Sequence, residues 1–299
     1  MADAGRRTTS RRDLSRHERF EEVSPEVGVI DPDALTEFLD DDPDAAMALL
    51  ADMVAATDEQ LRALARAQAG RVMVEAARSG PHRRRGVGRL RRVRLSQAEG
   101  DVDVDASLDA LVAARGTSTA PDPADVVVGA WQRPDVSLCL LVDRSGSMSG
   151  DRLATAAVAA AAVMFRVPLD CSVVAFAEDA VVVCGQDESR DPDEVVGDLL
   201  RLRGFGVTDV GLALRTAAAQ LSRSTAGRRV AVLLSDCRAT SGGDPLGHVA
   251  GVDELVVLAP EDDTADAVAL AETVGARWTV VGGPSTVAEA LVRVLGPAS

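Results

Sequence analysis

The chain has 299 residues, and its 32 basic side chains against 47 acidic ones give a net charge of −15 at neutral pH. Every basic residue is an arginine. A chain without lysine cannot supply a P-loop lysine, a Schiff-base lysine or the phosphate-binding lysine of a kinase, which excludes several large enzyme classes. Aromatic residues are 2% of the chain, so it has few side chains that could stack on the bases of single-stranded nucleic acid.

Composition also bears on where the protein works. The first residues mix arginines with acids and contain no apolar run, so we expect no secretory signal. The longest uncharged, mostly apolar stretch, 153–165, is shorter than the roughly 20 residues needed to span a bilayer. The cysteines are far apart and lack Cys-x-x-Cys spacing, which predicts reduced thiols in a cytoplasmic protein. They are Cys139, Cys171, Cys184 and Cys237.

The length predicts about two domains, and the N-terminal part is expected to be helical. Residues 1–25 mix arginines with polar and acidic residues without an apolar period, which predicts a disordered tail. Residues 26–116 form the expected helical region. Its helices begin after Asp31, behind Asp42-Pro43 and near Thr57, and Gly80-Pro81 ends the longest of them.

A basic segment lies within this region. Residues 82–94 carry seven arginines, and an alternating acidic stretch follows at 100–105, as a short strand or an extended arm. The arginines could bind the phosphates of nucleic acid, or they could form a solvated loop neutralised by nearby acids. The acidic net charge and the scarcity of aromatic residues favour the neutralised loop or a protein partner, so nucleic acid is not expected as the main ligand. Turn-forming residues then predict a linker over 117–125.

Residues 126–299 alternate apolar runs of strand length with helices. Strands are predicted at 126–131, 137–142, 171–177, 180–184, 229–235, 254–259 and 277–281. Helices are predicted at 151–167, 192–202, 209–222, 265–274 and 285–295. This alternation predicts an α/β domain with a doubly wound, mostly parallel sheet and helices on both faces. The first of these helices is apolar nearly all round, so we expect it to be central and buried.

Oxygen-bearing side chains follow the strands of this predicted sheet. Asp143, Ser145 and Ser147 come directly after the first core strand. Thr208 precedes a helix, and Asp236 ends a later strand. The carboxyl ends of parallel strands meet at one edge, where α/β sheets bind ligands. Two carboxylates with neutral hydroxyls suit Mg²⁺, and an incomplete ligand shell would accept an acidic group from another molecule.

This three-part pattern resembles the metal-ion-dependent adhesion site of von Willebrand factor A (VWA) domains, over about residues 125–299. The resemblance implies a Rossmann-like fold and a bound Mg²⁺, or Mn²⁺ or Ca²⁺, on these five residues. One departure is Cys237, where many relatives have glycine after the third-segment aspartate.

Residues 140–148, 83–94 and 100–108 more narrowly resemble intracellular bacterial VWA proteins that work beside MoxR-type AAA+ ATPases. These proteins are related to magnesium and cobalt chelatase subunits. The resemblance implies a non-enzymatic adaptor whose metal site engages the ATPase, or an acidic residue of a client, during complex assembly or cofactor insertion. Because this chain lacks lysine, we expect a separate partner to hydrolyse ATP. The alternatives are an accessory subunit of a metal chelatase and a nucleic-acid-binding protein that uses Arg83 to Arg94.

Overall fold

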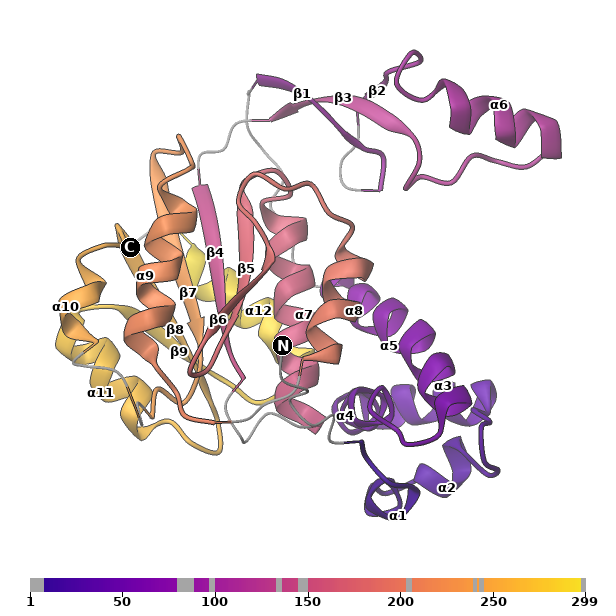
Figure 1. Cartoon of the computed structure of the whole chain (residues 1–299), viewed down its shortest axis with the longest axis horizontal. Coiled ribbons are helices and arrows are strands. Elements are labelled where there is room, and N and C mark those ends of the chain that lie inside the picture. Colours follow the sequence, from indigo (N-terminus) through magenta and orange to yellow (C-terminus); the bar gives the residue numbers. More distant parts are fainter. Residues whose placement is uncertain are drawn as a thin grey trace.

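The centre of the molecule is a six-stranded sheet in the order β6-β5-β4-β7-β8-β9 (Figure 1). The computed structural model describes residues 8–79, 89–96, 100–132, 136–144, 150–202, 206–238, 241 and 245–296. The strands are β4 (Val136–Asp143), β5 (Cys171–Phe176), β6 (Ala180–Cys184), β7 (Arg228–Leu234), β8 (Glu254–Pro260) and β9 (Arg277–Val281). All neighbours are parallel except the edge strand β6, which is antiparallel to β5. The doubly wound, mostly parallel α/β sheet expected from the sequence is therefore confirmed.

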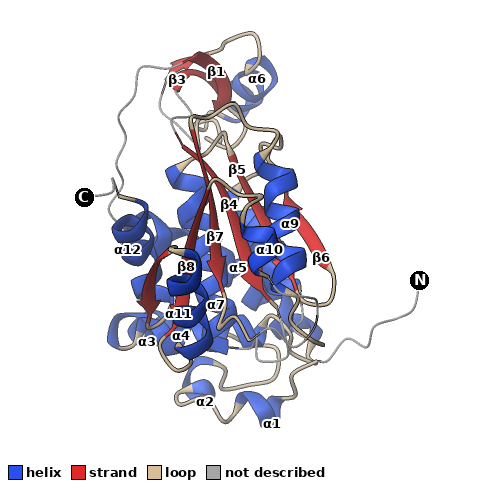
Figure 2. Ribbon diagram, turned by 90° about the vertical axis from the view of Figure 1, so that its left-hand side faces the viewer, coloured by secondary structure: helices blue, strands red, loops and turns tan. Residues whose placement is uncertain are grey.

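Helices cover both faces of this sheet (Figure 2). The alternating pleat of β4 sends Leu138 and Leu140 into one core and Cys139 and Leu141 into the other. The first core is covered by α7 (Gly150–Arg166), α8 (Pro192–Arg201) and α12 (Pro284–Leu295). The second is covered by α9 (Val210–Leu221) and α11 (Ala265–Val274), with the short α10 (Leu246–Val249) against α9.

The N-terminal helices form a third layer on the outside of α7. These helices are α3 (Pro32–Asp41), α4 (Pro43–Met53) and α5 (Glu59–Ser79), and α4 and α5 pack directly against α7. One continuous apolar core runs from these helices through α7 to the sheet. The alanine-rich α7 is consequently buried on both sides, as its nearly uniform apolar surface predicts. Within the described ranges, no helix is long and apolar enough to cross a membrane.

The start of the chain differs from the expected disordered tail. From residue 8 onward it contains α1 (Arg11–Leu14) and α2 (Phe20–Val23). Leu14, Phe20 and Val23 are at most 1% exposed, and the Arg11 guanidinium lies 4.9 Å from the centre of the Phe20 ring. These apolar residues are too sparse to form a helical period, but each is buried against the neighbouring helices, which fixes the segment.

A small antiparallel sheet precedes the main one. It consists of β1 (Arg89–Arg94), β2 (Asp101–Val102) and β3 (Val127–Gln132), in the order β1-β3-β2. Helix α6 (Leu108–Thr117) lies beside it, and the unit projects from the main sheet (Figure 1). The strand expected near 126–131 thus forms, but it pairs with the basic segment instead of the main sheet. The expected linker at 117–125 lies within this unit, between α6 and β3.

The basic segment is partly neutralised within the small sheet. The Nε of Arg92 lies 2.6 Å from an Asp103 carboxylate oxygen, and Arg94 donates to the Asp125 carbonyl at 3.0 Å. This ion pair agrees with the expectation that nearby acids balance the arginines. The arginines at 83–85 lie outside the described residues.

The continuous core predicts that the N-terminal layer and the main sheet unfold together. Leu50, on α4, is fully buried, so Leu50→Ala should destabilise the whole fold by about 2 to 5 kcal/mol. Hydrogen exchange of the β4 and β7 amides should accelerate accordingly. The control is Leu64→Ala on α5, because Leu64 is 41% exposed and should have little effect. Faster exchange confined to α1–α5 would contradict a shared core.

Candidate functional site

Two of the predicted residues meet at the carboxyl edge of the sheet. β4 and β7 are parallel neighbours in which Val142 pairs with Leu234, so the residues that follow leave the sheet side by side. Asp143 and Asp236 both line one cleft of about 420 Å³. Their exposures are 5% and 9%, which makes them two nearly buried carboxylates that open onto a shared space.

Thr208 lies on the opposite side of Asp143. Asp143 pairs with Phe176 at the end of β5, and the next residue, Ala177, accepts a hydrogen bond from the Asp209 N–H at 3.0 Å. This bond places Thr208, which is 3% exposed, at the end of β5. Asp143 is therefore flanked by Asp236 along one neighbouring strand and by Thr208 along the other. The predicted ligands Ser145 and Ser147 lie outside the described residues.

Ser235 is a site residue that the sequence analysis missed. Its hydroxyl donates to an Asp143 carboxylate oxygen at 2.6 Å and accepts from the Cys237 N–H at 2.8 Å. The Arg238 N–H donates to Asp236 Oδ1 at 3.0 Å. These bonds orient both carboxylates and tie the end of β4 to the turn after β7. In the sequence, the feature that points to Ser235 is its position immediately before the predicted ligand Asp236.

Cys237 has an unusual backbone conformation in the turn after Asp236. Its φ is 60°, in the left-handed region that favours glycine. The tight turn after Asp236 is therefore kept with a side chain in place. Burial raises the pKa of the Cys237 thiol to about 12, so the thiol stays protonated beside the two carboxylates.

The cleft beside the carboxylates is lined by both charged and apolar residues. Arg152, at the start of α7, contacts Asp236 Oδ2 at 3.4 Å and Asp262 Oδ2 at 2.9 Å. Neither Arg152 nor Asp262 was singled out as a metal-site residue from the sequence. The remaining lining residues are Asp151, Thr155, Leu234, Ser235, Pro260, Glu261, Val281 and Gly282.

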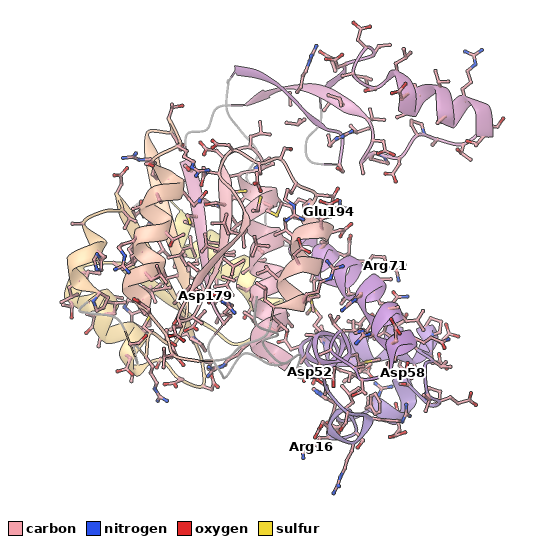
Figure 3. The ribbon with its side chains drawn as sticks, in the orientation of Figure 1. Arg16, Asp52, Asp58, Arg71, Asp179 and Glu194 are labelled. Atoms are coloured by element: carbon pink, nitrogen blue, oxygen red, sulfur yellow. The ribbon has the colours of Figure 1, made fainter. Side chains whose placement is uncertain are left out.

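Two carboxylates of α4 hold the helices that begin at this cleft. Asp52 accepts from the Gly150 N–H, the first residue of α7, at 2.9 Å and lies 2.9 Å from His17 Nε2. Asp44 accepts from the N–H and hydroxyl of Ser285, at the start of α12, at 2.7 and 2.9 Å. Figure 3 shows Asp52 where α4 meets the beginning of α7. A carboxylate is favourable at a helix N-terminus, so the N-terminal layer directly fixes the edges of the site.

The donors at this edge fit a hard divalent cation. Asp143, Asp236 and Thr208 offer only oxygen atoms, and Mg²⁺ is commonly held by one or two carboxylates together with other oxygens. Across the part of the chain that the structure describes, no three His, Cys, Asp or Glu side chains are grouped to hold a metal. The oxygen donors Asp143, Asp236 and Thr208 suit Mg²⁺ better than zinc, which typically takes nitrogen or sulfur ligands.

The acidic lining of the cleft predicts a specific pH effect. Burial and repulsion from Asp44 and Asp262 raise the pKa of Asp151 from 3.8 to about 6. Its charge opposes folding above pH 6, and this penalty disappears as pH falls from about 6 to 4, because the folded protein then takes up the proton first. Asp151→Asn should raise Tm at pH 7.5 in EDTA, and the gain should vanish near pH 4.

Asp253→Asn is the matched control for this experiment. A hydrogen bond from Arg229 lowers the pKa of Asp253, so its charge favours folding and its removal should not raise Tm at pH 7.5. A gain for Asp151→Asn that is constant across this pH range would contradict the assignment.

Comparison with known proteins places the chain in a family. Its residues 71–282 match the family described as "VWA domain containing CoxE-like protein". No curated protein matches the chain. An aerotolerance-related membrane protein from Bacteroides fragilis NCTC 9343 is 16% identical with a TM-score of 0.44, covering 55% of this chain and 100% of that chain.

Two other solved structures are similar at a comparable level. BatB from Bacteroides thetaiotaomicron is 16% identical with a TM-score of 0.42, covering 54% of this chain and 97% of that chain. A von Willebrand factor type A protein from Catenulispora acidiphila is 19% identical with a TM-score of 0.42, covering 55% of this chain and 42% of that chain. On the family match, which spans more than half of its length, the chain belongs to the VWA CoxE-like family.

Proposed function

We propose that this VWA CoxE-like protein is a metal-dependent interaction adaptor. In this proposal Asp143, Ser145, Ser147, Thr208 and Asp236 hold Mg²⁺, and a partner protein binds at the same place. The observation that carries the proposal is that Asp143 and Asp236 lie at the same edge of the sheet. Both are nearly buried, and both open onto one cleft at the carboxyl edge of the sheet.

The charge balance at this edge suits an acidic partner. Two carboxylates nearly neutralise a divalent cation, so an incoming Asp or Glu would meet little repulsion. Bound Mg²⁺ would supply a coordination position for that carboxylate. The chain's own residues orient the site: Ser235 holds Asp143, and the Arg238 N–H holds Asp236. The adjoining cleft gives the partner's neighbouring residues a place to bind.

We infer that the partner is a AAA+ ATPase of the MoxR type or its client. Membership in the CoxE-like family supports an accessory role, and the absence of lysine from this sequence favours a separate partner as the source of ATP hydrolysis. Within the small sheet, Arg92 and Arg94 are bonded to Asp103 and Asp125. These bonds favour the adaptor over a nucleic-acid-binding protein that uses this segment.

Affinity capture with the full chain tests the proposal. A AAA+ protein should be retained in Mg²⁺ and lost in EDTA, and Asp143→Ala should abolish its retention in Mg²⁺. Asp187→Ala is the control, because this carboxylate is exposed and pairs with Arg223 away from the cleft. Retention that survives both EDTA and Asp143→Ala would contradict a metal-bridged contact. Recovery of RNA that is insensitive to Asp143→Ala would instead support nucleic-acid binding.

A further inference from the structure

We propose that the ion pair between Arg152 and Asp236 competes with the metal for the Asp236 carboxylate. This competition sets the metal affinity of the site. Without a divalent cation, the guanidinium of Arg152 neutralises Asp236. When a cation is bound to Asp236, the guanidinium keeps its contact with Asp262. This inference rests on the proposed function, because it takes Asp236 to be a metal ligand.

The contacts of Arg152 with the two described carboxylates, Asp236 and Asp262, are unequal. The 2.9 Å contact to Asp262 Oδ2 is a normal charge-assisted hydrogen bond, whereas the 3.4 Å contact to Asp236 Oδ2 is longer than one. The side chain of Arg152 is 22% exposed and lines the cleft, so it is not locked inside the core. The guanidinium is therefore anchored at Asp262 and makes its weaker contact with the proposed metal ligand.

Asp236 needs this compensation when it has no metal. Its side chain is 10% exposed, and Asp143, which lines the same cleft, is also an acid. A buried charge is costly unless it is paired or hydrogen-bonded. Oδ1 of Asp236 accepts the Arg238 N–H, while Oδ2 faces Arg152. The guanidinium thus neutralises the carboxylate through the oxygen that the backbone bond leaves available.

Asp262 gives the guanidinium a second place to bind. It follows β8, and its side chain is 70% exposed, so its charge is stabilised by water as well as by Arg152. Replacing Asp262 should strengthen the hold of Arg152 on Asp236. Removing Arg152 should free Asp236 for the metal. The two substitutions are therefore expected to change metal affinity in opposite directions.

Calorimetric titration of the full chain with MgCl₂ tests this inference. Arg152→Gln should bind Mg²⁺ about 5- to 10-fold more tightly than the wild type, at the lower end of typical couplings between two sites. Asp262→Asn should bind it several-fold more weakly. Arg152→Lys keeps the positive charge and should stay within about twofold of the wild type, a difference small on the scale of such couplings. Arg293→Gln is the surface control, since Arg293 pairs with Glu289 on α12.

The double variant separates the proposed competition from a simple loss of negative charge. If Asp262 acts through Arg152, the effect of Asp262→Asn should shrink by at least half in the Arg152→Gln background. An undiminished effect there, or an unchanged or weaker affinity in Arg152→Gln alone, would overturn the role of Arg152 while leaving the metal site in place. Absence of Mg²⁺ binding in the wild type and in every variant would overturn the proposed function, and this inference with it.

Discussion

The structure depends on covering a helix that is apolar on nearly all sides. Helix α7 packs against the sheet on one side and against α4 and α5 on the other, and twelve of its seventeen residues are buried. Its small alanine side chains allow neighbouring elements to approach closely. The same arrangement positions the functional edge, because the first residue of α7, Gly150, donates to Asp52 of the covering layer. The N-terminal helices are thus part of the architecture of the site.

Burial of carboxylates is the second constraint. Asp143 and Asp236 are nearly buried at the same edge of the sheet, which is unfavourable for their charges unless other groups compensate them. Within the described structure, compensation comes from the Ser235 hydroxyl, the Arg238 N–H and the guanidinium of Arg152. A divalent cation would compensate the same two carboxylates more strongly. Competition between a resident guanidinium and a metal follows from this arrangement of charges.

Much of the fold was predictable because periodicity is a local property. The strands and helices of the main sheet begin and end within one or two residues of the predicted positions, and α7 is buried as expected. Which strands pair with each other was harder to predict. The sequence of β3 has a normal strand pattern, but β3 pairs with β1, which is rich in arginine and lacks the apolar pattern of a strand. The burial of Phe20 was also missed, because isolated apolar residues give no period.

The placement of Asp143 and Asp236 at one edge of the sheet was predictable, because each lies at or just after the end of a strand. The supporting residues of the site come from elsewhere: Asp52 lies far away in sequence, and the ion pairs of Arg152 form only in the folded chain. Thermal unfolding with and without MgCl₂ tests the metal site most directly, because a ligand of the folded state raises Tm by mass action. The wild type should be stabilised, and Asp236→Ala should lose most of that shift. An equal shift in the variant, or none in the wild type, would contradict the account.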